Sequence, residues 1–207
     1  MKHNKFLSIA LLSGAFLLSA CGSKGVEPTP TGPSYTITDV EYLTLKSKLS
    51  SPKIFIDGNF TVDMSMSGVT FKNKIANAKA DIYPQGSHIV LDLDVSSYSA
   101  PGKANGDTYE YDEDEKTWSK ETGEVKVSAF SSFIFGVVEY MPASFDELSY
   151  NDDTRFYSGS LTQGDSTLVT KFMVKNGQFL TIDMVGMVTY EFSDYGTTTV
   201  TLPEVVA

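Results

Sequence analysis

The chain contains little of the chemistry on which most catalytic sites depend. Its 207 residues include one cysteine and two histidines. The single cysteine is Cys21, so no disulfide can form within the chain, and thiol redox chemistry and cysteine-rich metal sites are excluded. Arg155 is the only arginine, which excludes a cluster of guanidinium groups that clamps phosphate. A fold without disulfides must be held together by its hydrophobic core.

The shortage of histidine also argues against hydrolase activity. The sequence Gly164-Asp165-Ser166 is similar to a motif of one class of hydrolases, but such an enzyme needs a histidine base, and no histidine follows His88. We therefore interpret this motif as part of a hairpin turn. His88 lies in a segment rich in turn residues, and we expect it to be exposed in a loop. The sequence predicts no enzymatic activity and no cofactor.

Acidic residues outnumber basic ones by 26 to 16, which gives a net charge of −10. A surface of this sign repels nucleic acid, so we expect no nucleic-acid partner. The densest acidic run is Asp112-Glu113-Asp114-Glu115, which lacks the glycine and the ligand spacing of an EF-hand loop. We interpret it as a solvated hairpin tip, with weak calcium binding as the alternative, and predict no metal site.

The first 21 residues have the pattern of a bacterial lipoprotein signal. Lys2 and Lys5 precede an apolar run over residues 6–18, and Leu18-Ser19-Ala20-Cys21 reads as a lipobox. The run is shorter than the roughly 20 residues of a spanning helix. An ordinary signal peptide that happens to contain cysteine is the alternative.

The similarity to lipoprotein signals implies cleavage before Cys21 and a diacylglyceryl thioether on its sulfur, with palmitate or similar acyl chains. It therefore predicts an extracytoplasmic protein anchored to the cell membrane by lipid, and displayed on the cell surface if the cell is Gram-positive. Residues 21–34 combine the lipidated cysteine with a linker rich in glycine, proline, serine and threonine. Residues 35–207 form one domain of ordinary size.

The pattern of apolar residues predicts a mainly β (α+β) domain with few helices. Helical spacing covers residues 39–49, with Asp39 as the cap and Val40, Leu43 and, further along, Leu45 and Leu49 on the apolar side, and again residues 127–141. Alternation with a period of two predicts antiparallel strands. These strands cover residues 60–66, 76–82, 89–95, 155–161, 167–174, 178–184, 188–192 and 197–202. Asn176-Gly177 predicts a type I′ hairpin turn. We expect a single curved antiparallel sheet, a half-barrel, wrapped around the helices.

Methionine and aromatic residues gather on the apolar faces of the predicted strands and of the second helix. Methionine adapts to ligands of variable shape, although it also fills ordinary cores. We therefore predict an apolar ligand cavity between sheet and helix, or a filled core as the alternative. Its candidate residues are Phe60, Val62, Met64, Met66, Leu91, Leu93, Phe130, Phe133, Val137, Met141 and Met184.

Several short segments resemble the LolA/LppX-like bacterial lipoproteins. They are Tyr-Glu-Phe-Ser-Asp-Tyr-Gly at residues 190–196, Thr-Val-Thr-Leu-Pro at residues 199–203, Tyr-Glu-Tyr-Asp at residues 109–112 with Trp118, and Lys-Asn-Gly-Gln at residues 175–178. The resemblance implies a half-barrel sheet wrapped around helices, a cavity for acyl chains, and transport of lipids or lipoproteins across the cell envelope. The resemblance does not allow any functional residue of that family to be assigned to a position in this sequence.

These observations predict a membrane-anchored lipoprotein that binds an apolar ligand, such as an acyl chain or lipid, as a carrier or sensor in the cell envelope. The alternative is a non-enzymatic module for cell-surface interaction or envelope structure, with a filled core. The first reading predicts a lipid partner besides the membrane. The second predicts a protein partner, whose identity the residues do not indicate.

Overall fold

The computed structural model describes residues 33–84, 86–99 and 101–205. The predicted signal segment, Cys21 and most of the predicted linker lie outside the described residues. Among the described residues, no helix combines the length and the apolar character needed to cross a membrane.

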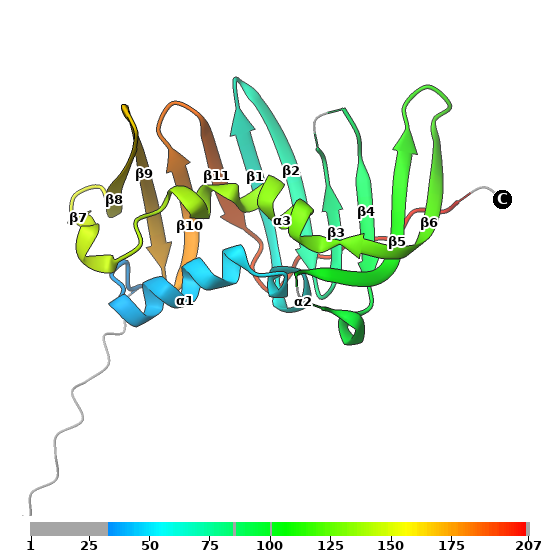
Figure 1. The fold of residues 1–207 in the computed structure, drawn as a ribbon, viewed down its shortest axis with the longest axis horizontal. Helices are drawn as coiled ribbons and strands as arrows, with labels where there is room; N and C mark the ends of the chain where they lie inside the picture. Colours follow the sequence, from blue (N-terminus) through cyan, green and yellow to red (C-terminus); the bar gives the residue numbers. More distant parts are fainter. Residues whose placement is uncertain (1–32, 85, 100, 206–207) are drawn as a thin grey trace, which may run out of the picture. The chain divides into compact units, whose positions relative to one another are not determined.

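One antiparallel sheet of eleven strands is the main element of the described chain, in agreement with the predicted mainly β class (Figure 1). The strands are β1 (Asn59–Met66), β2 (Val69–Ala76), β3 (Lys79–Ile82), β4 (Ile89–Leu93), β5 (Lys103–Asp112), β6 (Thr117–Lys126), β7 (Ser149–Asn151), β8 (Phe156–Gln163), β9 (Ser166–Lys175), β10 (Gln178–Met184) and β11 (Val188–Ser193). Their order is β6-β5-β4-β3-β2-β1-β11-β10-β9-β8-β7. The last strand therefore pairs with the first, in the middle of the sheet.

The helices lie across one face of this sheet, which we call the inner face (Figure 1). They are α1 (Asp39–Ser50), α2 (Lys53–Asp57) and α3 (Val127–Phe135). Short 3-10 turns lie at Val95–Ser97, before α3, and at Gly136–Tyr140 and Phe145–Glu147, after it. The predicted helix over residues 127–141 is thus an α-helix for its first half and a 3-10 turn for most of the rest.

The first predicted helix is confirmed, but its cap was wrong and its apolar side was right only at Leu45 and Leu49. Thr38, not Asp39, caps α1, since its hydroxyl accepts a hydrogen bond from the Glu41 backbone and the Glu41 carboxylate accepts one from the Thr38 backbone. This capping box satisfies donors that would otherwise be unpaired. Val40 is 71% exposed and Leu43 46% exposed. The helix buries Leu45 and Leu49, as predicted, and with them Tyr42, which was not predicted.

Two predicted strands were also wrong. Residues 76–82 do not form one strand, because Asn77 and Ala78 make a two-residue turn with φ of 48° and 68° between β2 and β3. Alternation continues across such a short turn, so the pattern mimicked a single strand. Residues 197–202 form no strand. Because β1 and β10 already pair with both edges of β11, the chain leaving β11 finds no adjacent free edge.

The remaining strand predictions agree with the structure apart from their ends. The strand expected over residues 89–95 ends at Leu93, where a 3-10 turn begins with Asp94 as its cap. Asn176 and Gly177 have φ of 51° and 71° between β9 and β10, as a type I′ turn requires. The Gly-Asp motif at residues 164–165 is likewise the turn between β8 and β9.

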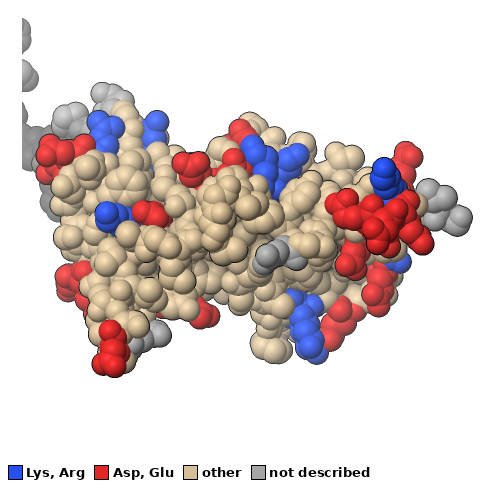
Figure 2. Space-filling model, turned by 90° about the horizontal axis from the view of Figure 1, so that it is seen from above, with Lys and Arg blue, Asp and Glu red and all other residues tan. Residues whose placement is uncertain are grey.

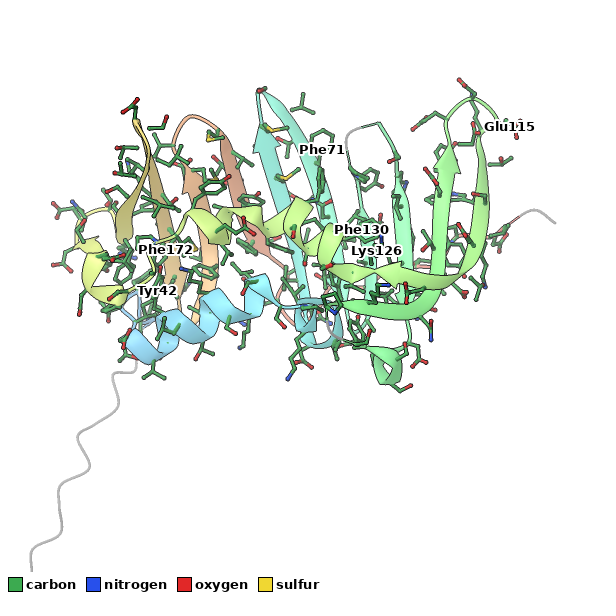
Figure 3. The ribbon with its side chains drawn as sticks, viewed as in Figure 1. Tyr42, Phe71, Glu115, Lys126, Phe130 and Phe172 are labelled. Carbon is green, nitrogen blue, oxygen red and sulfur yellow. The ribbon has the colours of Figure 1, made fainter. Side chains whose placement is uncertain are left out.

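The hydrophobic core fills the space between the helices and the inner face. The ring of Tyr42 on α1 stacks on Phe172 of β9 with 5.7 Å between centroids (Figure 3). The Tyr42 hydroxyl donates a hydrogen bond of 2.6 Å to the carbonyl of Pro142, and the Lys46 ammonium donates one of 2.7 Å to the same oxygen. These contacts fix α1 to the sheet and to the segment that follows the 3-10 turn at Gly136–Tyr140.

Candidate functional site

A pocket of about 560 Å³ lies at the inner face, where α1 ends. It is bounded by α1, α2, the beginnings of β1 and β10, the end of β11 and the turn that follows β11. The lining residues are Leu45, Ser47, Lys48, Leu49, Ser51, Lys53, Ile54, Asp57, Gly58, Asn59, Phe60, Gly177, Gln178, Phe179, Phe192, Tyr195 and Gly196. They come from three separate stretches of the sequence, residues 45–60, 177–179 and 192–196.

The wall of the pocket is a group of aromatic rings on the sheet. Phe60 packs against Phe192 at 5.7 Å and against Tyr195 at 5.5 Å between centroids, and Phe179 packs against Phe192 at 6.1 Å. Leu45 and Leu49 of α1 supply the opposite side. Ligand pockets in proteins are commonly lined in this way, with apolar and aromatic side chains and a few polar groups.

Hydrogen bonds hold this wall in place. The Tyr195 hydroxyl donates to the Phe179 carbonyl at 2.7 Å, and the Gly196 backbone donates to the Asn59 carbonyl at 2.9 Å. Burial raises the pKa of Tyr195 far above its ordinary value, so the phenol stays neutral and keeps its proton at physiological pH. The turn after β11 is therefore tied to both β10 and β1.

The connection between α2 and β1 closes the pocket at one end. A Cβ atom at Gly58 would lie 2.0 Å from the backbone oxygen of Ile54 and 2.8 Å from the side chain of Ile75. Glycine is therefore required there by lack of space, since the φ of −72° at Gly58 suits any residue. This close approach lets α2 fold directly back onto the sheet.

The rim of the pocket is polar. Lys48, Lys53, Asp57 and Gln178 border it, so two ammonium groups face one carboxylate. Asn59 also lines the pocket, and its buried side-chain oxygen accepts no hydrogen bond from the described residues.

The described chain begins beside this rim. The carbonyl of Ser34 accepts a hydrogen bond of 2.8 Å from the Asn176 backbone, and the Ser34 backbone donates one of 3.1 Å to the Asn176 side chain. The next residue of that hairpin, Gly177, lines the pocket. The guanidinium of Arg155 lies 4.2 Å from the ring centroid of Tyr35. The chain segment that enters the domain is thus fixed to the same end of the sheet as the pocket.

Of the residues predicted to line a ligand cavity, Phe60 also borders this pocket. Most of the others are buried in the hydrophobic core: Val62, Met64, Leu91, Leu93, Val137, Met141 and Met184. Phe130, on α3, is partly buried against that core (Figure 3). Met66 and Phe133 are 41% and 42% exposed. Leu45 and Leu49 follow the helical spacing of α1 but were not assigned to a cavity, and most of the other pocket residues that sequence reasoning missed lie at element ends or in turns, where no periodic signal marks them.

The other segments singled out in the sequence have structural roles. The run Asp112–Glu115 forms the tip of the β5–β6 hairpin, where acidic side chains gather at one end of the molecule (Figure 2). Among the described residues, no three His, Cys, Asp or Glu side chains are grouped as a metal site would require. His88 is not an exposed loop residue, because its side chain is only 18% exposed and its Nε2 lies 2.6 Å from an oxygen of Asp81.

Comparisons with protein-family models, with curated proteins and with solved structures find no match for this chain.

Proposed function

We propose that this chain is a lipid-anchored, non-catalytic protein of the cell envelope that holds an acyl chain or another apolar ligand in the pocket beneath α1. The observation that carries the proposal is the pocket itself, about 560 Å³ with an aromatic wall. Ligand pockets for small molecules have volumes of about 300–1,000 Å³. A carrier or sensor needs a preformed apolar site of this kind.

The polar rim supports an amphiphilic ligand. An acyl chain placed against Phe60 and Phe192 would leave its headgroup near Lys48 and Lys53. The whole chain carries a net charge of −10, so this small excess of positive charge is local. It favours a headgroup that is acidic or rich in acceptors.

The proposed anchor would keep the pocket close to the membrane. Cys21 precedes Ser34 by thirteen residues, which span about 20 Å as a flexible coil and about 40 Å in a polyproline-like conformation. Ser34 is hydrogen-bonded to Asn176, beside the pocket rim. A lipid leaving the membrane would therefore have a short distance to travel. We extend the proposal to the finer fold, a LolA/LppX-like half-barrel curved around its helices.

One observation favours a second function. Eight of the residues first proposed to line a cavity, among them Val137 and Met141, are packed in the core. A domain whose inner face is filled in this way suits an envelope-structural or surface-interaction module, whose partner would be a protein. Ligand binding separates the two functions.

The binding test uses a side chain added at the pocket rim. Gln178 is exposed at the start of β10 and borders the pocket, so Gln178→Trp adds bulk there without entering the core. Ser166→Trp is the matched control, because Ser166 is also exposed and is the first residue of β9. It lies at the end of β9 that is far from the Asn176-Gly177 turn and therefore from the pocket. We expect the wild type and the control to take up a fluorescent fatty acid and the rim variant to bind it several-fold more weakly. Equal binding by all three would show that the ligand does not occupy this pocket, and no uptake together with no co-purifying lipid in native mass spectrometry favours the filled module.

A separate test concerns the anchor. We expect cells to incorporate labelled palmitate into the wild type and not into Cys21→Ala. Equal labelling of both would remove the lipoprotein assignment and leave an ordinary secreted domain.

A further inference from the structure

A second group of aromatic residues lies on the outer face of the sheet, opposite the helices. The rings of Tyr83 and His88 stack at 3.9 Å between centroids, Trp118 meets His88 edge-on at 4.6 Å, and Tyr111 lies 5.1 Å from Trp118. We call these four residues the aromatic platform. All four are partly exposed, so solvent reaches part of each ring.

The strand register places the platform on the outer face. Val125 of β6 belongs to the core, so Trp118, an odd number of positions away, faces outward. Trp118 pairs with Tyr111 across the β5–β6 ladder, which places both side chains on the same face. On β3, Ala80 and Ile82 are in the core and Asp81 between them faces outward.

Hydrogen bonds fix the platform in position. Nε2 of His88 lies 2.6 Å from an oxygen of Asp81. The backbone of Tyr83 donates a hydrogen bond of 3.0 Å to the buried side-chain oxygen of Asn73, and the backbone of Tyr111 donates one of 3.0 Å to the His88 carbonyl. The rings are thus ordered before any ligand arrives, which reduces the entropy lost on binding.

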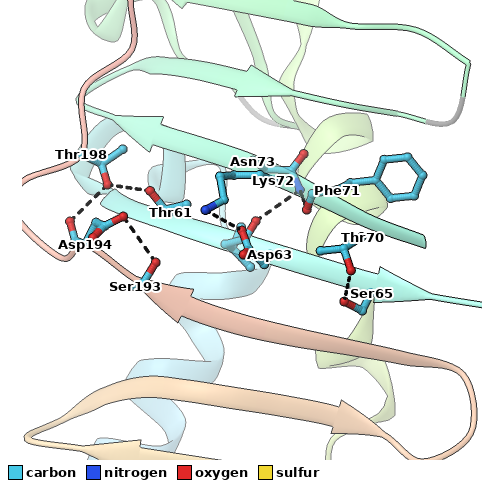
Figure 4. A network of polar contacts seen from close by, with 11 residues as sticks. Thr61, Asp63, Ser65, Thr70, Phe71, Lys72, Asn73, Ser193, Asp194 and Thr198 are labelled. Atoms are coloured by element: carbon cyan, nitrogen blue, oxygen red, sulfur yellow. Dashed lines mark hydrogen bonds and ion pairs between the residues drawn. The ribbon is translucent and has the colours of Figure 1, made fainter. Parts of the chain in front are cut away.

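A hollow of about 310 Å³ adjoins the platform and shares Asp81 and Tyr83 with it. Its other lining residues are Thr70, Phe71, Lys72 and Lys74. The Lys72 ammonium lies 3.6 Å from Asp63 with its side chain 57% exposed (Figure 4). Lys74 pairs in register with Asp81. The Asp63 oxygen of this pair is buried, so Lys72 also serves that carboxylate, whereas Lys74 forms no ion pair among the described residues and is the lysine available to an anion.

We propose that the platform and this hollow bind a saccharide that carries an acidic group. The C–H bonds on one face of a sugar ring are weakly positive and pack against the negative face of an aromatic ring. Hydroxyl groups would donate to the second oxygen of Asp81, and the acid would lie near Lys72 and Lys74. The site is independent of the pocket beneath α1, since the two lie on opposite faces of the sheet.

The single tryptophan gives a direct test. Trp118 is the only tryptophan in the chain, so its fluorescence reports on the platform alone. We would titrate the purified full-length chain with a glucuronate-containing oligosaccharide and, separately, with an uncharged N-acetylglucosamine oligomer of equal length. We expect a saturable change in emission with the acidic oligosaccharide at lower concentration than with the neutral one. No saturable change with either, or equal affinity for both, would overturn the proposal.

Variants assign the roles of the residues. We expect Lys74→Ala and Tyr83→Leu each to weaken binding of the acidic oligosaccharide about ten-fold, the usual scale of a lost stacking or charge contact. The controls are Lys171→Ala, an exposed lysine on β9, and Tyr150→Leu, a half-buried tyrosine on β7. The conservative Tyr83→Phe should retain binding, which separates loss of the ring from loss of folding. Unchanged affinity in both Lys74→Ala and Tyr83→Leu would overturn the proposal.

Discussion

Removal of the two donors to the carbonyl of Pro142 tests how α1 is held on the sheet. Pro142 is buried, and its oxygen accepts hydrogen bonds from the Tyr42 hydroxyl at 2.6 Å and from the Lys46 ammonium at 2.7 Å. When one donor is removed, the other still pairs with the carbonyl. The two substitutions should therefore be strongly coupled.

The expected magnitudes follow from this sharing. Tyr42→Phe keeps the ring stacked on Phe172 and loses one hydrogen bond, so it should lower the free energy of unfolding by about 1 kcal/mol. Lys46→Met keeps most of the stem, but it also removes the 3.0 Å hydrogen bond that the Lys46 ammonium donates to the Met141 carbonyl. Burial lowers the pKa of Lys46, against a smaller opposing effect of Glu147, so losing its charge offsets part of the lost hydrogen bonding and we again expect about 1 kcal/mol.

The double variant leaves a buried carbonyl without either donor, which costs about 1–3 kcal/mol beyond the lost bonds. We expect the double variant to lose about 1–2 kcal/mol more than the sum of the single variants. Urea unfolding followed by circular dichroism measures all four proteins. Additivity within about 0.5 kcal/mol would refute the shared-acceptor reasoning.

A matched control is Tyr98→Phe. The Tyr98 hydroxyl is buried and has no hydrogen-bond partner among the described residues, so its removal should be neutral or stabilising. An equal loss for Tyr98→Phe and Tyr42→Phe would show that the hydrogen bond to Pro142 contributes nothing measurable.

Three further predictions concern the turn, the core and the helix cap. Replacing both Asn176 and Gly177 with valine should destabilise the β9–β10 hairpin by about 1 kcal/mol or more, because both positions have positive φ, and thermal unfolding would show it. Val137→Asp should prevent folding, since Val137 is 2% exposed in the core; a folded variant with normal circular dichroism would contradict the packed core. Hydrogen bonds from the backbone and hydroxyl of Thr38 hold the pKa of Glu41 below its ordinary 4.5, so the stabilisation is present above about pH 4.5 and is lost as pH falls through the lower folded-state pKa. Glu41→Gln should therefore unfold more easily than wild type at about pH 6 and should lose that difference at about pH 2, and a constant difference would contradict the linkage.

Part of this molecule could be predicted from local patterns alone. The alternation in β1 and β10, the turn at Asn176-Gly177 and the helical spacing of α1 each reflect the local preferences of the backbone, which act whatever the rest of the chain does. The same local reasoning failed at Asn77 and Ala78, because a two-residue turn preserves the alternation that it interrupts.

The faces and ends of the elements required the tertiary structure. Helical spacing allowed Val40 and Leu43 as the buried side of α1, but the sheet accepts the side that carries Tyr42, whose ring meets Phe172 from a strand 130 residues later in the chain. Residues 197–202 alternate like a strand, yet β11 has no open edge for them. Thr198 instead contacts Thr61 on β1, with 3.1 Å between their hydroxyl oxygens (Figure 4).

The composition of the chain could be known from the sequence, but the two candidate sites could not. Composition determined that the chain has one cysteine, few histidines and a strongly acidic balance, and these counts hold in any fold. The pocket beneath α1 depends on Leu49, Phe60 and Tyr195, and the platform depends on Tyr83 and Trp118, which lie far apart in the sequence. Only the pairing of strands brings such residues together, because a local pattern records which face a side chain occupies and not which distant side chain it meets.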